Sequence, residues 1–212
     1  MVRKRIEELL TELSVGIYEK ESELSLSMLA ALAGESIILL GPPGVAKSMI
    51  ARRLKSAFKN SSSFEYLMSR FSTPDEIFGP VSISKLKDSD KYERSIKGYL
   101  PTADVVFLDE IRKAGPAIQN TLLTVINEKL FRNGDKEISL PLKLLIAASN
   151  ELPTQGEGLE ALWDRFIIRI ECSNIRQERN FFAMLTDSNS EAEVHVDNKL
   201  QISSAEYEDW RS

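Results

Sequence analysis

Ten consecutive residues decide the fold of this chain: Leu39-Leu40-Gly41-Pro42-Pro43-Gly44-Val45-Ala46-Lys47-Ser48. They join a short apolar run, residues 36–40, to a turn rich in Gly and Pro and then to a segment whose apolar residues have helical spacing. Backbone N–H groups of such a turn, at the start of a helix, can surround a phosphate group. Residues 41–48 therefore predict a nucleoside triphosphate site, with Lys47 at the β- and γ-phosphates and the Ser48 hydroxyl on Mg²⁺.

One position of this loop departs from the usual pattern G-x-x-x-x-G-K-[ST]. Ala46 stands where the second glycine is expected, so the backbone there must adopt a conformation that tolerates a Cβ atom. The alternative interpretation is a plain turn followed by an ordinary helix. The order of strand, loop, Lys-Ser pair and helix favours the phosphate site.

A second motif follows the apolar run at residues 105–108. Asp109 and Glu110 come directly after this run, at the carboxyl end of an expected buried strand, which is where ligands bind in open α/β sheets. Asp109 is predicted to hold Mg²⁺, and Glu110 to act as the general base for the attacking water. The alternative is a strand that ends in a solvated pair of carboxylates.

Two further residues complete a hydrolytic site. The apolar strand predicted at residues 144–148 leads to Asn150, which could hydrogen-bond the γ-phosphate and the attacking water. Arg165 lies near the end of an expected short helix, residues 159–166, which runs into an expected strand at residues 166–171, and it has the position of an arginine finger. A turn or helix cap for Asn150, and a surface ion pair with Asp164 for Arg165, are the alternatives if each residue is taken alone.

These motifs together resemble the AAA+ ATPases, and within them the MoxR branch, most closely the RavA-type proteins. The matching stretches are residues 41–48, 69–74, 107–111, 113–115, 126–128, 131–134, 147–151 and 164–166. The resemblance implies a P-loop αβα sandwich with a central parallel sheet and a hexameric ring that uses ATP and Mg²⁺ to remodel protein complexes. It also implies a von Willebrand factor A domain partner and, for the RavA type, a lysine decarboxylase. Arg112 departs from the aromatic or amide residue expected after Ile111.

Composition agrees with a cytoplasmic enzyme of this class. A chain of 212 residues can bury one substantial core, and its net charge of −5 gives no general attraction to nucleic acid. The single Cys172 excludes an internal disulfide, and the lone His195 offers no metal cluster. No apolar run approaches the length needed to span a membrane, and the helix expected after Arg5 does not resemble a signal peptide.

The core is expected to occupy residues 1–185. Two hairpins are predicted as insertions, one at residues 79–98 and one around the Asn133-Gly134 turn, and the resemblance places both at a central pore. Residues 186–212 are expected to form a polar linker and then a helix that begins at a capping box of Ser203 and Glu206. With so few residues left for Tyr207 to pack on, we expect a chain cut before or at a helical lid, without its second sensor arginine.

We therefore predict an ATP hydrolase that is weakly active as this chain alone. Two other classes of function stay open at this stage. One is a nucleic-acid-associated AAA+ motor or loader, which salt-dependent binding to DNA would favour. The other is a nucleotide-gated binding module with little hydrolysis, which a turnover measurement would distinguish.

Overall fold

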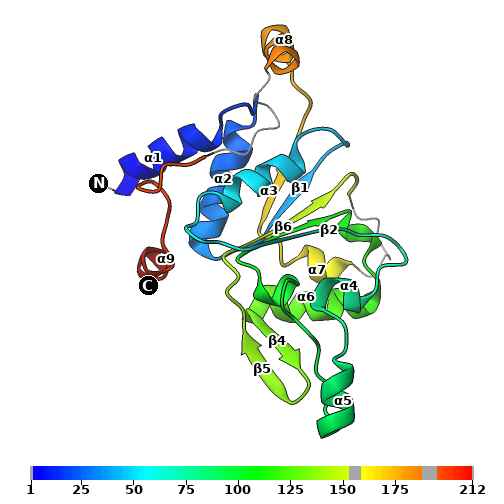
Figure 1. Cartoon of the computed structure of the whole chain (residues 1–212). Coiled ribbons are helices and arrows are strands. Elements are labelled where there is room, and N and C mark those ends of the chain that lie inside the picture. Colours follow the sequence, from blue (N-terminus) through cyan, green and yellow to red (C-terminus); the bar gives the residue numbers. More distant parts are fainter. Residues whose placement is uncertain (1, 153–158, 188–194, 212) are drawn as a thin grey trace.

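The computed structural model of the chain describes residues 2–152, 159–187 and 195–211, and a five-stranded parallel sheet lies at its centre (Figure 1). The strand order is β2-β3-β6-β1-β7. The strands are β1 (Ile37–Leu40), β2 (Ser63–Leu67), β3 (Val105–Asp109), β6 (Leu144–Ser149) and β7 (Ile168–Glu171). Strands β1, β3 and β6 were expected from the sequence to within two residues at each end. The mixed α/β fold with a central parallel sheet is thereby confirmed.

Both faces of the sheet are buried, because successive strand side chains point to opposite sides. On β3, Val105 and Phe107 join one apolar cluster, whereas Val106 and Leu108 join the other. The same alternation holds on β6, where Ile146 belongs to the first cluster. Near-continuous apolar strands of this kind need helices on each side, and Figure 1 shows α2 and α3 on one side of the sheet and α6 and α7 on the other.

The first face is covered by helices from the N-terminal half of the chain. They are α1 (Val2–Leu13), α2 (Glu21–Ala33) and α3 (Lys47–Lys55). Gly34 ends α2 in the left-handed conformation, with φ 72°, which glycine adopts readily. The turn at Gly34 thus brings the chain from α2 directly into β1.

The second face is covered by α4 (Pro74–Phe78), α6 (Pro116–Glu128) and α7 (Glu160–Trp163). Two short 3₁₀ segments, η1 (Leu100–Thr102) and η2 (Ile111–Lys113), flank β3. The hairpin of β4 (Leu130–Asn133) and β5 (Lys136–Ser139) follows α6 and confirms the hairpin predicted around the Asn133-Gly134 turn. Its Phe131 packs on Phe78 of α4, with ring centroids 5.5 Å apart.

The hairpin predicted at residues 79–98 is wrong. This insertion contains the helix α5 (Ile83–Ser89), and only an isolated bridge between Val81 and Arg94 keeps antiparallel pairing. The Ser82 hydroxyl accepts a hydrogen bond from the backbone N–H of Lys85 and caps α5, which favours a helix over an extended strand. Figure 1 shows α5 extending away from the sheet.

The C-terminal helix also differs from expectation. Helix α9 (Ser204–Arg211) has the predicted capping box, but Tyr207 is only 2% exposed and belongs to the first apolar cluster. Its hydroxyl donates to the carbonyl oxygens of Ala31 and Lys143, and its ring meets Phe58 edge-on. The idea that Tyr207 has nothing to pack on is therefore wrong, because its partners lie far upstream in the sequence. Helix α8 (Glu178–Thr186), by contrast, buries none of its side chains.

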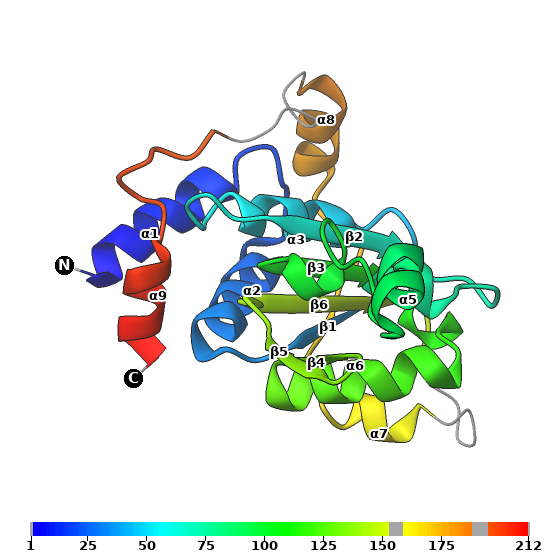
Figure 2. The same ribbon diagram turned by 60° about the horizontal axis from the view of Figure 1, so that its bottom comes forward.

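A charged contact holds α9 against α1, and Figures 1 and 2 both place these helices side by side. The Arg5 guanidinium donates to both carboxylate oxygens of Glu206 and to the carbonyl oxygens of Leu200 and Gln201. Arg5 is the largest cause that lowers the pKa of Glu206 to about 2. Within the residues that the structure describes, no helix is long and apolar enough to cross a membrane.

We expect Glu206→Gln to lower the free energy of unfolding by about 1 kcal/mol, or roughly 2–4 °C in Tm, because it weakens the Arg5 contact and the capping box. The folded-state pKa lies below the usual value of 4.5, so the contribution is complete above pH 4.5 and is lost as the pH falls toward 2. Thermal melts at several pH values measure this difference. Glu208→Gln, an exposed carboxylate on the same helix, is the matched control, and equal melting of the two variants at pH 7 would contradict the prediction.

Candidate functional site

The candidate site lies where three neighbouring strands end. In the parallel pairs, Leu40 of β1 lies opposite Ser149 of β6, and Leu108 of β3 opposite Ala147. The loop at residues 41–48, Asp109 with Glu110, and Asn150 therefore leave the sheet at the same edge. Strand β6, which leads to Asn150, lies between β1 and β3 in the sheet.

Backbone geometry gives the loop its shape. Gly41, Gly44 and Ala46 all have positive φ, at 149°, 84° and 65°. Gly41 also lies against β7, since a Cβ atom there would come within 2.2 Å of the carbonyl oxygen of Cys172. Ala46 sits in the left-handed region and begins α3, at a cost of roughly 1–2 kcal/mol for a residue with a Cβ. The alanine thus keeps the conformation that the expected glycine would have adopted.

Lys47 is buried inside this loop, with 6% of its surface exposed. Its ammonium group donates to the carbonyl oxygens of Gly41 and Pro42, at 2.5 and 2.9 Å, and to Oδ1 of Asn150 at 2.8 Å. An ammonium group has three protons, so each has a partner. The cation is thereby held between the loop and the end of β6.

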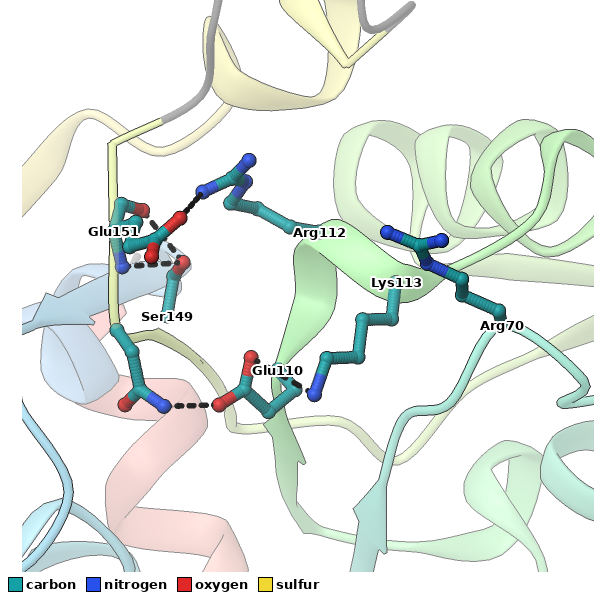
Figure 3. A pocket seen from close by; sticks show the side chains of 7 residues that line it. Arg70, Glu110, Arg112, Lys113, Ser149 and Glu151 are labelled. Carbon is teal, nitrogen blue, oxygen red and sulfur yellow. Dashed lines mark hydrogen bonds and ion pairs between the residues drawn. The ribbon is translucent and has the colours of Figure 1, made fainter.

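Asn150 connects Lys47 to Glu110. Its Nδ2 donates to Oε1 of Glu110 while its Oδ1 accepts from Lys47. The reverse orientation of the amide would place donor against donor at Lys47, so both contacts fix the same orientation. Glu110 has a left-handed backbone, with φ 54°, and its second oxygen lies 3.5 Å from the Lys113 ammonium (Figure 3). Such strain in a residue other than Gly is common at functional sites.

Hard oxygen ligands for a divalent cation are present at the same edge. Asp109 carries a carboxylate whose Oδ1 accepts from the backbone N–H of Glu110 at 2.9 Å, and Ser48 offers a half-buried hydroxyl at the start of α3. Hydroxyl and carboxylate oxygens suit Mg²⁺, which usually keeps waters and phosphate oxygens as further ligands. Among the described residues, no group of three or more His, Cys, Asp or Glu side chains could hold a metal by itself.

Arg165 does not join these side chains. It is exposed, just after α7, and is absent from the residues that line the pocket at Glu110. The alternative ion pair between Arg165 and Asp164 is not seen. The Asp164 carboxylate instead lies 3.9 Å from the Arg169 guanidinium group. Arg112, whose role the sequence left open, donates to Glu151 at 2.6 Å.

A second pocket beside the loop was missed by the sequence motifs. It has a volume of about 520 Å³ and is mainly apolar, and it includes Gly44, Val45 and Ala46 on one side and Ile17, Tyr18 and Ile175 on others. These side chains come from the segment before α2, the phosphate loop and the segment after β7. No local pattern marks such residues, because only the fold brings the three segments together.

Polar contacts hold the segments around the pocket. The ammonium of Lys20, 3% exposed, donates to the carbonyl oxygen of Ser173 at 2.8 Å. The Glu19 carboxylate accepts from the backbone N–H groups of Arg176 and Gln177 at the start of α8. Cys172 nearby is buried, and burial raises the pKa of its thiol to about 11, so this thiol stays protonated and inert near neutral pH.

A known protein family matches nearly the whole chain. Residues 4–211 match the family described as the MoxR domain in the MoxR-vWA-beta-propeller ternary systems. Two uncharacterized proteins of Methanocaldococcus jannaschii are each 43% identical, over 87% and 85% of this chain and 48% of their own lengths. The chaperone MoxR1 of Mycobacterium tuberculosis is 26% identical over 71% of this chain and 40% of its own. The chain thus spans about half the length of the curated relatives it matches.

Solved structures show the same fold. A protein of Cytophaga hutchinsonii, provisionally assigned as an ATPase, aligns with a TM-score of 0.76 and 21% identity, covering 99% of this chain and 62% of its own. NtrX of Brucella abortus aligns with a TM-score of 0.57 and 20% identity, covering 89% of this chain and 46% of its own. NtrX has also been solved in complex with ADP and with ATP.

We expect Gly41→Ala to destabilise the protein by at least about 2 kcal/mol more than Gly44→Ala. Both glycines have positive φ, but only at Gly41 would the new Cβ meet a backbone carbonyl, while at Gly44 nothing lies within 4 Å. Thermal melts of the two variants, side by side, measure the difference. Equal melting temperatures would show that the Gly41 loop moves away from β7 at little cost.

Proposed function

This chain belongs to the MoxR family of AAA+ ATPases, and we propose that it binds ATP with Mg²⁺ and hydrolyses the bond to the γ-phosphate. The observation that carries the proposal is the continuous contact from Lys47 through Asn150 to Glu110. It joins a cation on a phosphate-binding type of loop to a carboxylate that can act as a base. Triphosphate hydrolysis needs a group that binds phosphate and a group that activates water, and both thus lie at one edge of the sheet.

Residues of the loop have distinct proposed roles in binding. The backbone N–H groups of Gly44, Val45 and Ala46 surround the phosphates, because Pro42 and Pro43 have none, and Lys47 neutralises the phosphate charge. To reach a phosphate, the Lys47 ammonium must exchange at least one of its present carbonyl or amide partners for a phosphate oxygen. The apolar pocket beside Val45 and Tyr18 is the proposed place for the adenine base, because it is continuous with the loop.

Hydrolysis follows from the groups around Glu110. We propose that its carboxylate takes a proton from water as the water oxygen attacks the γ-phosphorus and the bond to the ADP oxygen breaks. Asn150 orients the water and the γ-phosphate. Mg²⁺, held by Ser48 and Asp109, would neutralise charge on the phosphate oxygens. Because Asn150 contacts both Lys47 and Glu110, a change of partner at Lys47 reaches the base through a single side chain.

The exposed position of Arg165 supports a role in trans. Its side chain is on the surface after α7 and outside the Glu110 pocket, so we propose that it completes the site of a neighbouring copy in a ring, a hexamer by family resemblance. The low activity expected of this chain on its own stays a prediction, as does its cytoplasmic location.

Two insertions support a proposed role in chaperone-like remodelling of protein complexes. The Asn133 side chain of β4 accepts from the backbone N–H of Arg94 at 2.5 Å and donates to its carbonyl oxygen at 3.1 Å. These two hydrogen bonds join the insertion that contains α5 to the β4–β5 hairpin. The insertion and the hairpin therefore form one continuous surface. We propose a client at this surface.

The family description supports a further proposal about partners. Since the matched family occurs in MoxR-vWA-beta-propeller systems, we propose a von Willebrand factor A domain partner for this chain and a β-propeller in the same assembly. A RavA-like role and a lysine decarboxylase partner, which the resemblance implied, stay predictions.

Lys47→Ala should weaken ATP binding by roughly 100-fold, because the cation that neutralises the phosphates is lost. Glu110→Gln should leave binding within a few-fold and lower turnover by about 10²- to 10⁴-fold, because the base acts only in the chemical step. Isothermal titration and phosphate release measure the two effects. Lys55→Ala, an exposed lysine on α3, is the control. Normal hydrolysis by Glu110→Gln would show that the assigned base is wrong.

Mixing two inactive variants tests the trans role of Arg165. In assembled rings of the full-length protein, Arg165→Ala should lower turnover by about 10³- to 10⁵-fold if the residue is an arginine finger. A mixture of Arg165→Ala with Lys47→Ala should recover activity, because some contacts then pair an intact nucleotide site with an intact finger. If mixed oligomers form, as shown by co-purification of differently tagged variants, and activity does not recover, Arg165 does not act in trans.

A further inference from the structure

A pocket that the phosphate loop does not line adjoins Glu110. It has a volume of about 460 Å³ and is lined by three cations, Arg70, Arg112 and Lys113, together with Glu110 and Glu151 (Figure 3). None of residues 41–48 lines it, whereas Asn150 does. The pocket therefore adjoins the proposed point of water attack and is distinct from the loop that would hold ADP.

Among the described residues that line this pocket, three are cations and two are carboxylates. Arg112 contacts Glu151 at 2.6 Å, and Lys113 lies 3.5 Å from Glu110. Arg70 makes no hydrogen bond or ion pair with any part of the chain that the structure describes, and its side chain is exposed at the pocket. A guanidinium group offers a fork of donors that matches two oxygens of a phosphate, which makes Arg70 the cation available for an anion.

The backbone that carries Arg70 is fixed to the catalytic strand. Just before it, the N–H of the buried Met68 donates to the carbonyl oxygen of Asp109 at 2.9 Å. Just after it, the Ser72 hydroxyl accepts from the backbone N–H of Ser69 and from the Tyr66 hydroxyl, at 2.9 and 3.0 Å. The Ser72 hydrogen bonds hold the two ends of the loop together. The hydrogen bond of Met68 attaches the start of the loop to Asp109, the residue before Glu110. Arg70 can therefore keep a constant position relative to the base.

We propose that Arg70 binds the terminal phosphate group of the nucleotide in cis, and the inorganic phosphate after hydrolysis, on the side opposite the loop. This inference rests on the proposed ATPase function and adds a residue to it. Hydrolysis releases a free phosphate anion, and the exposed guanidinium group of Arg70 favours that anion on its side away from ADP. Arg70 thus distinguishes a nucleotide that has a γ-phosphate from ADP.

The test compares binding of ADP alone with binding of ADP plus beryllium fluoride, which takes the place of the γ-phosphate. Arg70→Ala should leave the Kd of ADP within about twofold and weaken ADP–beryllium fluoride by about 10- to 100-fold, the value of one or two charge-assisted hydrogen bonds. Arg70→Lys should recover part of the loss, because it keeps the charge without the fork. Arg3→Ala, an exposed arginine on α1, is the matched control. Calorimetry at fixed ionic strength measures all four proteins.

Three results would overturn the proposal. Unchanged beryllium fluoride affinity in Arg70→Ala would show that Arg70 does not bind the phosphate group. An equal loss for ADP and for ADP–beryllium fluoride would show that the residue maintains the loop instead. A change in self-association by sedimentation, with unchanged beryllium fluoride affinity, would place Arg70 against a second copy of the chain. Failure of the unmodified protein to bind ADP at all would instead overturn the ATPase function itself, and the inference with it.

Discussion

Parallel pairing of β6 with both β1 and β3 is the constraint on which the site depends. It sets Leu40 opposite Ser149 and Leu108 opposite Ala147, so the residues that follow these strands emerge together. A slip of one residue would exchange the two faces of a strand and would bury Val106 with the wrong cluster. Burial on both faces therefore fixes the register. The register in turn brings Lys47, Asn150 and Glu110 into contact.

Two residues of the proposed site have a strained backbone. Ala46 and Glu110 both have left-handed backbones, although neither is glycine, and each conformation costs roughly 1–2 kcal/mol. The cost at Ala46 is offset by the N–H of Ile50 donating to its carbonyl oxygen as α3 begins. At Glu110 it is offset by hydrogen bonds from the backbone N–H to Asp109 and from Asn150 to the carboxylate. In each case a packed neighbour holds the strained residue.

Sequence reasoning succeeded where a motif is local and failed where partners are distant. The strands, the Gly34 cap and the β4–β5 hairpin have short-range signals, such as apolar runs and an Asn-Gly turn. The sequence predicts a strand in place of helix α5 because Val81 and Ile83 alternate with serines. That alternation does not reveal the Ser82 cap, which favours a helix. Tyr207 depends on Ala31 and Lys143, which no local pattern connects to it. Arg70 was within a matching motif, but its place near Glu110 needed the fold.

The surface proposed for a client has a continuous physical connection to the nucleotide site. The loop that carries Arg70 ends at Thr73, whose capping box with Glu76 begins α4. Asp75 of α4 pairs with Arg94, and the Arg94 backbone pairs with Asn133 of the β4–β5 hairpin. Arg94 therefore connects α4 to both insertions. A displacement of α4 would be passed through Arg94 to both, which is a physical route by which a change at the nucleotide site could become a movement at a distant surface.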